Sequence, residues 1–403
     1  MGNKKEIETI EKLSREKTKE VLNETYNQIK EILEYYLDLK EEYYSLISLW
    51  IIGTYYHDNF ESYPYLFFNA MRGSGKSRAL RLICSLAKDG NVMASPTEAT
   101  LFRTKGTLGI DEFERVANKD KSSVRELLNG AYKKGIKIFR MKKKKSLSGE
   151  EQVVEEFEVY RPVTMANIWG MDEVLGDRCL TLVLEKSNDP VKTRLTEDFE
   201  TNNFVKKSIK NLNQCSLCSV VSLKNINTMW NNYISNRYKT TLTTYSSYNT
   251  ITTLTTQQQE LFDKIHDSDI KGRELELFLP IFFIAEFLGK EGLENIISIA
   301  KEISSEKKHE QEIESLDVMV YDFISRQEAG LIFNSVKDLT NRFREFSEES
   351  AEWLNSKWFG RSLKRLNLVV DKKRRGHGVE VMLNIPKAIE KLKIFKRENE
   401  QKN

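Results

Sequence analysis

The stretch Tyr65–Leu80, YLFFNAMRGSGKSRAL, combines the residue types that a phosphate-binding loop needs. An apolar run that suits a buried strand is followed by a glycine-rich turn and then by helix-forming residues. In the pattern G-x-x-x-x-G-K-[ST], backbone N–H groups cradle phosphates, the lysine reaches the β- and γ-phosphates, and the hydroxyl binds Mg²⁺. The predicted nucleotide-binding residues are therefore Gly73, Ser74, Gly75, Lys76 and Ser77, with Ser77 also a predicted Mg²⁺ ligand.

The first glycine of this pattern is replaced by Ala70. Alanine costs little at a position with negative φ, whereas a position with positive φ favours glycine. The backbone conformation at Ala70 therefore decides whether the replacement affects phosphate binding.

A pair of carboxylates follows a second apolar strand, Thr107–Ile110. A carboxylate at a strand end beside phosphates can hold Mg²⁺, which favours few carboxylates together with phosphate oxygens. The pair begins 35 residues after Lys76, which leaves room for a helix and another strand between them. We predict that Asp111 binds Mg²⁺ and that Glu112 activates a water for attack on the γ-phosphoryl group.

Two further side chains have positions that suit phosphate chemistry. The expected strand Val163–Asn167 ends in an amide that can orient the attacking water, although a terminal asparagine is also a common turn former. Arg178 lies just before the expected strand Leu180–Leu184. An arginine there is either a surface residue or a finger that stabilises transition-state charge in a neighbouring subunit's site.

Composition bounds the class of protein. The 403 residues predict two to three domains, and 39% hydrophobic content supports packed cores. A net charge of +3 is too small to argue for nucleic acid by itself, so local clusters must carry that case. The four cysteines suggest a reducing compartment. The charged start of the sequence and its short apolar runs lead us to expect a cytoplasmic protein with no membrane partner.

The order of elements predicts the fold class and its parts. Strand-like runs alternate with helical ones between residues 64 and 186, which favours a three-layer α/β domain with a mostly parallel sheet. The expected strands are Tyr65–Phe68, Val92–Ala94, Thr107–Ile110, Val163–Asn167 and Leu180–Leu184. The expected parts are a helical region (1–40), an α/β core (41–190), a helical lid (191–310) with a Thr-rich loop (239–259), a C-terminal domain (311–395) and a charged tail (396–403).

The sequence GSGKS, GIDE, MAN and DRC, in this order, resembles an AAA+ ATPase. Across roughly residues 41–395, the sequence is similar to the minichromosome-maintenance-like helicases of mobile genetic elements. The segments that carry this similarity are FNAMRGSGKSRAL, GTLGIDEFE, LLNGAYKKG, RPVTMANI and GRELELFLPIFFIAEFL. The resemblance implies a P-loop αβα core that uses ATP and Mg²⁺ in a ring, expected to be a hexamer. It also implies that Asn167 is sensor 1, Arg178 the arginine finger and Arg273 the sensor 2 arginine.

Residues 133–162 read as a β-hairpin between the acidic pair and Asn167. Its first arm and tip carry the predicted DNA-binding residues Lys142, Lys143, Lys144 and Lys145. One interpretation is cross-strand pairing of these lysines with the glutamates of the returning arm, worth little per pair. The other, which the resemblance favours, places the lysines on single-stranded DNA in the channel of a hexamer.

The C-terminal domain has the outline of a winged helix. Two expected helices, Ser335–Phe346 and Ala351–Leu366, are followed by strands Leu368–Asp371 and Val379–Ile385 around a basic turn. The predicted contacts to duplex DNA are Lys357, Arg361, Lys364 and Arg365 on the second helix, and Lys372, Lys373, Arg374 and Arg375 in the wing. The alternative is a winged helix that docks a protein and carries a solvated charge run.

The expected function is therefore an ATP-dependent DNA helicase for replication of a mobile genetic element. A non-translocating AAA+ DNA-binding ATPase is the alternative, acting as a helicase loader, an origin initiator or an integration regulator. Strand displacement separates the two, because only the helicase unwinds a forked duplex.

Overall fold

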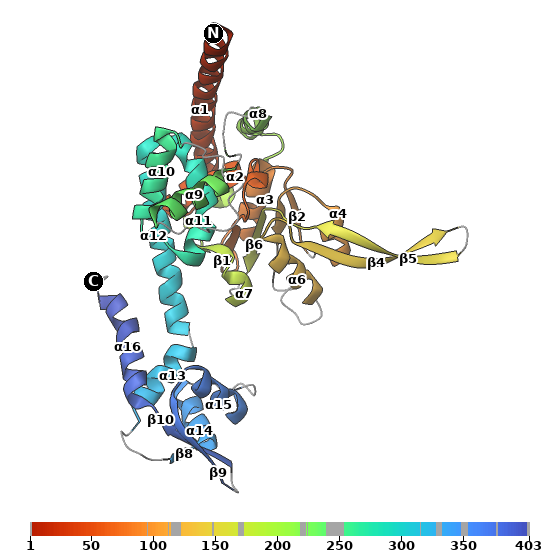
Figure 1. Ribbon diagram of the computed structural model, residues 1–403. Coiled ribbons are helices and arrows are strands. Elements are labelled where there is room, and N and C mark those ends of the chain that lie inside the picture. Colours follow the sequence, from red (N-terminus) through yellow and green to blue (C-terminus); the bar gives the residue numbers. More distant parts are fainter. Residues whose placement is uncertain are drawn as a thin grey trace. The chain divides into compact units, whose positions relative to one another are not determined.

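The computed structural model describes residues 2–94, 96–111, 113, 122–146, 149–167, 173–217, 223, 225–238, 254–314, 316–327, 333–347, 354–375 and 378–400. The chain divides after Ser304 into two compact units, each treated by itself below (Figure 1).

A five-stranded sheet forms the centre of the first unit. Its strands are β1 (Tyr65–Ala70), β2 (Asn91–Met93), β3 (Leu108–Ile110), β6 (Val163–Asn167) and β7 (Cys179–Leu184). They lie in the order β2-β3-β6-β1-β7, and every neighbouring pair is parallel. Each strand overlaps one expected from the sequence, so the prediction of an α/β fold with a parallel sheet is confirmed. Apolar side chains on both faces of such a sheet require helices on both sides.

Helices flank this sheet and extend the first unit on either side of it (Figure 1). They are α1 (Gly2–Tyr36), α2 (Glu41–Thr54), η1 (His57–Asn59), α3 (Lys76–Leu86), α4 (Glu98–Arg103), α6 (Ser122–Ala131), α7 (Glu173–Gly176), η3 (Lys192–Arg194), α8 (Asn203–Leu217), α9 (Ile226–Arg237), α10 (Thr256–Asp267), α11 (Gly272–Ala285), η4 (Glu286–Leu288) and α12 (Gly289–Glu314), which runs on past Ser304. One hydrophobic core continues from Leu22 of α1 through the sheet to Ile303 of α12.

Helix α2 is buried on all sides, which explains why its sequence is apolar around the whole helix rather than along one face. Every residue from Tyr43 to Thr54 is buried, and the indole Nε1 of Trp50 donates to the carbonyl of Pro64 at 2.8 Å. Gly53 allows a close approach, since a Cβ at this position would lie 2.2 Å from the hydroxyl oxygen of Tyr63. The strongly apolar helix expected within residues 41–57 is therefore confirmed.

The hairpin expected at residues 133–162 is also present. It consists of β4 (Lys137–Ser146) and β5 (Gly149–Glu158), paired antiparallel from Lys137 opposite Glu158 to Ser146 opposite Gly149. Both strands are longer toward the turn than the sequence suggested, and the hairpin extends away from the sheet (Figure 1).

The second unit packs helices against a small antiparallel sheet. Its elements are α13 (Leu316–Ser325), β8 (Phe333–Ser335), α14 (Val336–Ser347), α15 (Ser356–Arg365), β9 (Val369–Arg375), β10 (Gly378–Leu383) and α16 (Ile385–Glu400). The sheet order is β8-β10-β9, and both pairs are antiparallel. Phe323, Phe343, Phe359 and Leu363 are central to its separate core.

Helix caps explain two of the expected boundaries that were wrong. The Thr-rich loop was expected to reach residue 259, but α10 begins at Thr256 because Thr255 and Gln258 form a capping box. The helix expected from Ala351 begins instead at Ser356, because the side chain of Asn355 accepts from the N–H groups of Lys357 and Trp358. The remainder of the Thr-rich segment, 239–253, lies outside the described residues.

Within the part of the chain that the structure describes, none of the helices has both the length and the apolar character needed to cross a membrane.

Candidate functional site

The loop between β1 and α3 has the backbone geometry of an anion-binding turn. Gly73 and Gly75 have φ of +78° and +83°, conformations that side chains with a Cβ rarely adopt. The N–H and the hydroxyl of Ser74 both donate to the carbonyl of Met71, at 3.3 and 2.8 Å, which closes the turn. Ala70 is the buried last residue of β1 and does not have positive φ. Its methyl group therefore causes no backbone strain.

The N-terminus of α3 supplies the donors for an anion. The first turn of an α-helix leaves N–H groups without intrahelical acceptors and carries partial positive charge. Lys76 is the first residue of this eleven-residue helix, and Ser77 is exposed beside it. The predicted residues Gly73, Ser74, Gly75, Lys76 and Ser77 therefore form one continuous surface suited to phosphate.

A cavity of about 500 Å³ lies against this loop, within the usual size range of a ligand site. Three segments line it, and two of them were not expected from the sequence. The first is the phosphate loop with the start of α3 (Gly73–Arg78), and the second is the end of α1 with the turn that follows it (Tyr36–Leu39). The third is the end of β7 with the segment after it, represented by Leu184, Lys186, Ser187, Lys192, Thr193 and Glu197.

The segment 186–197, here called the strap, is tied to α3 by Arg78. The guanidinium of Arg78 donates to the carbonyls of Lys192 and Leu195, each at 2.7 Å. Glu197 lies 3.7 Å from Arg78 Nε and 2.7 Å from Arg81. The strap is also stabilised within itself, since backbone N–H groups of Lys192 and Val191 donate to Asp189 and lower the pKa of its carboxyl.

The turn after α1 is tied to the same strap. Ser187 donates to the Asp38 carboxylate at 2.7 Å, and the Lys192 ammonium lies 3.8 Å from its other oxygen. The Tyr36 hydroxyl donates to the carboxylate of Asp198, and burial together with that bond raises the pKa of Tyr36 to about 12. The N-terminal helix α1 therefore ends in the wall of this cavity.

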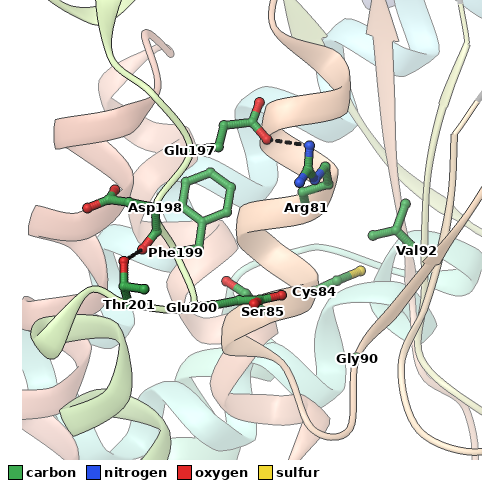
Figure 2. Close-up of a pocket in the computed structure, with 10 residues that line it drawn as sticks. All are labelled: Arg81, Cys84, Ser85, Gly90, Val92, Glu197, Asp198, Phe199, Glu200 and Thr201. Atoms are coloured by element: carbon green, nitrogen blue, oxygen red, sulfur yellow. Dashed lines mark hydrogen bonds and ion pairs between the residues drawn. The ribbon is translucent and has the colours of Figure 1, made fainter.

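A second groove, of about 570 Å³, lies along α3 and is drawn in Figure 2. Glu197, Asp198, Phe199 and Glu200 form one wall, and Arg81, Cys84 and Ser85 of α3 form the other. Burial raises the pKa of the Cys84 thiol to about 12, so this sulfur is not a nucleophile at neutral pH. No residue of the phosphate loop lines this groove, so we assign the candidate site to the smaller cavity.

Asp111 and Asn167 lie at the same carboxyl edge of the sheet as the phosphate loop, although neither of them lines the cavity beside that loop. β6 lies between β1 and β3, with Asn167 paired opposite Asn69 and Met165 opposite Ile110. Asp111 directly follows β3 and its N–H donates to Met93 O at 3.0 Å. Because all three strands are parallel, Ala70, Asp111 and Asn167 occur at the same edge. Glu112 lies outside the described residues.

Arg178 and Arg273 lie at the opposite, amino edge. The Arg178 carbonyl accepts from the N–H of Tyr65, the first residue of β1, so the six-residue strand, about 17 Å long, separates it from the phosphate loop. The guanidinium of Arg178 donates to Val174 O, and its Nε is a buried donor with no acceptor among the described residues.

Arg273 belongs to the same edge. It lies 2.7 Å from Asp177 and 2.6 Å from Glu276, and its guanidinium carbon is 5.4 Å from the ring centroid of Tyr132. The structure therefore brings the two predicted arginines together through Asp177, the neighbour of Arg178, and places neither beside the phosphate loop of its own chain.

The predicted DNA-binding residues occur in both units. Lys142, Lys143, Lys144 and Lys145 are part of β4 in the first unit. In the second unit, Lys357, Arg361 and Lys364 are exposed at the spacing of one helix face. Arg365 is also exposed, but its guanidinium donates two hydrogen bonds to the carboxylate of Asp317 on α13, at 2.8 and 2.7 Å.

The wing strand β9 carries the other predicted cations. Lys372, Lys373 and Arg374 are exposed, and Lys373 Nζ lies 4.0 Å from the ring centroid of Phe333. The Arg375 side chain and His377 lie outside the described residues.

Comparison of the sequence with protein-family models gives no match. Comparison with curated proteins gives none either.

Sequence reasoning missed Asp38 and Arg78, although both shape the pocket. Their partners in the strap are more than a hundred positions away in the chain, so no local spacing indicates them. The available signal was indirect: charged and hydroxyl residues, Lys186, Ser187 and Lys192, follow the expected strand Leu180–Leu184.

We expect Arg78→Ala to loosen the strap. It removes two charge-assisted hydrogen bonds to backbone carbonyls, a loss of about 2 kcal/mol, or about 30-fold in local opening. Hydrogen–deuterium exchange of peptides covering 186–197 measures this opening. Arg81→Ala is the control, because an exposed ion pair contributes below about 1 kcal/mol. Equal exchange in the two variants would contradict the tether.

Proposed function

We propose that the chain is a P-loop ATPase of the AAA+ class that hydrolyses ATP with Mg²⁺. The observation that carries the proposal is the shared carboxyl edge, where the phosphate loop after β1, Asp111 after β3 and Asn167 at the end of β6 converge. Ligands of doubly wound sheets bind at such an edge, where the strand order changes direction. The chain provides that change, since β1 lies between β6 and β7 rather than beside β2.

The residues present fit ATP and Mg²⁺. Positive φ at Gly73 and Gly75 lets the loop backbone approach phosphates closely, and the cavity beside it has room for a nucleotide. In this proposal Lys76 binds the β- and γ-phosphates, Ser77 and Asp111 hold Mg²⁺, and Asn167 and Glu112 orient and activate the attacking water. Mg²⁺ bound there would neutralise charge that develops on the transferred phosphoryl group.

We propose further that the site is completed by a second copy of the chain in a ring, expected to be a hexamer. Arg178 and Arg273 support this part, because both lie at the edge of the sheet opposite to the phosphate loop of their own chain. An arginine held there can act on phosphates only in a neighbour. The buried Arg178 Nε has no acceptor among the described residues, which is consistent with a donor that is satisfied on assembly.

We propose that this motor is a DNA helicase of a mobile genetic element. Two separate basic elements support DNA as the partner: the hairpin β4–β5 and the winged-helix-like second unit. In the second unit, α15 exposes Lys357, Arg361 and Lys364 for phosphate contacts to duplex DNA, and β9 adds Lys372, Lys373 and Arg374. We leave Arg365 out of this set, because Asp317 neutralises it.

The roles proposed for Lys76 and Glu112 predict that their variants lose different steps of the ATPase cycle. Lys76→Ala should lose nucleotide binding together with ATP hydrolysis and strand displacement, because the triphosphate loses its main cation. Glu112→Gln should keep binding of a labelled nucleotide while hydrolysis stops. Filter binding, phosphate release and displacement of a forked duplex measure these steps. If the unaltered protein hydrolyses ATP without displacing a strand, it belongs to the loader or regulator class. If both variants lose nucleotide binding equally, Glu112 does not act by activating the attacking water.

The shared site predicts a dominant effect of Arg178→Ala. The variant alone should lose about 10³-fold or more in kcat, as expected for an arginine finger. Mixed with the unaltered protein, it should lower activity by more than dilution. Arg326→Ala, an exposed arginine of the second unit paired with Asp322, is the matched control. Full activity of a dilute monomer that survives Arg178→Ala would exclude a site shared between subunits.

A further inference from the structure

The chain leaves β7 at the same edge of the sheet from which the phosphate loop leaves β1. Leu184, the last residue of β7, pairs with Ala70, the last residue of β1. Because the two strands are parallel, the residues that follow each of them start side by side. Lys186 lies two positions after Leu184, at the beginning of the strap. The pairing of β1 with β7 therefore brings Lys186 to the phosphate loop.

The side chain of Lys186 reaches the first glycine of this loop. Its Cε lies 3.7 Å from the point that a Cβ on Gly73 would occupy. Lys186 also lines the cavity of about 500 Å³, together with Gly73, Gly75 and Lys76. A phosphate bound against the two glycines would therefore lie within reach of the Lys186 ammonium.

The backbone of Lys186 is held on both sides. On one side, Leu184 belongs to β7 and pairs with Ala70. On the other side, the Ser187 hydroxyl donates to the Asp38 carboxylate at 2.7 Å and accepts from the N–H of Asp189 at 3.1 Å. A group whose backbone is already fixed loses less conformational freedom when it binds a ligand. Only the side chain of Lys186 has to be ordered by a phosphate.

Two other cations that line the cavity are engaged by the protein itself. The Lys192 ammonium lies 3.8 Å from Asp38, and the Arg78 guanidinium donates to two carbonyls of the strap. Lys186 differs from both, because it is exposed and its ammonium has no hydrogen bond or ion pair with any residue that the structure describes. Lys186 can therefore meet a ligand without breaking a contact of the protein.

We propose that Lys186 binds a phosphate group of the nucleotide in the cavity of its own chain, as a second cation beside Lys76. The inference rests on the proposed function and adds a binding residue that lies outside the pattern G-x-x-x-x-G-K-[ST]. A hydrogen bond between an ammonium and a phosphate oxygen is about twice as strong as a bond between neutral groups. A lysine suits this position because it presents a compact charge on a flexible stem.

The contact is tested first on the unaltered protein, by acetylation of its lysines with an N-hydroxysuccinimide ester and peptide mass spectrometry. A saturating non-hydrolysable ATP analogue with Mg²⁺ should slow acetylation of Lys186 about tenfold, because the ammonium must leave the phosphate before it reacts. Lys105 is the control, since it is exposed and precedes β3 at the opposite edge of the sheet. An unchanged rate at Lys186, with Lys76 protected, would overturn the inference.

The contribution to affinity is tested with Lys186→Ala. We expect a fluorescent ATP analogue to bind this variant about tenfold more weakly, the loss of one hydrogen bond to a charged group. Lys186→Arg should lose less, because the charge is kept. Lys105→Ala is the matched control, and thermal unfolding checks that each variant folds. Equal affinity of Lys186→Ala and Lys105→Ala would contradict a phosphate contact.

The outcomes separate this inference from the proposed function. If the analogue binds the unaltered protein and protects Lys76 but leaves Lys186 reactive, only the role of Lys186 is wrong. If the analogue neither binds nor protects Lys76, the proposed function fails, and the inference fails with it. If a higher protein concentration protects Lys186 without nucleotide, and the analogue adds no protection, Lys186 contacts a second copy of the chain and the phosphate assignment is overturned.

Discussion

β1 pairs in parallel with β6 along one side and with β7 along the other, and this double pairing decides what meets at each edge of the sheet. At the carboxyl edge it places the start of the phosphate loop beside Asn167 at the end of β6, and β6 in turn separates the loop from Asp111, which follows β3. At the amino edge it fixes Arg178, whose carbonyl accepts from Tyr65. A shift of β1 by one residue would turn each of its side chains to the other face of the sheet, and β1 is buried along both faces. Helix α2 and the fully buried Phe67, Phe68 and Trp50 hold this strand in place.

The cavity beside the loop after β1 is built from long-range contacts as much as from the loop itself. Arg78 projects from the helix that begins at the loop and holds the strap through two carbonyls, while Asp38 reaches the same strap from the end of α1. Charged hydrogen bonds of this kind are costly to break where they are partly shielded from water. The end of the N-terminal helix is therefore part of the pocket wall, where Asp38 contacts Ser187 and Lys192 of the strap.

Much of the fold could be predicted from local pattern. The five sheet strands are short apolar runs bounded by turn residues. The spacing of the glycines, Lys76 and Ser77 indicates the loop at Gly73–Ser77. The pocket walls could not be predicted, because Asp38, Ser187 and Lys192 meet only after the chain has folded. Start points of α10 and α15 were missed because single capping residues, Thr255 and Asn355, decide them.

The central claim is that ATP binds at the carboxyl edge of this sheet, between the loop after β1 and the acidic residue after β3. A crystal structure with a non-hydrolysable ATP analogue and Mg²⁺ tests it most directly. The account predicts phosphates against the first turn of α3 and Mg²⁺ near Ser77 and Asp111, with Arg178 of a neighbouring copy facing the γ-phosphate. An analogue bound in the groove between Arg81 and Glu200, or phosphates remote from Asp111, would contradict it.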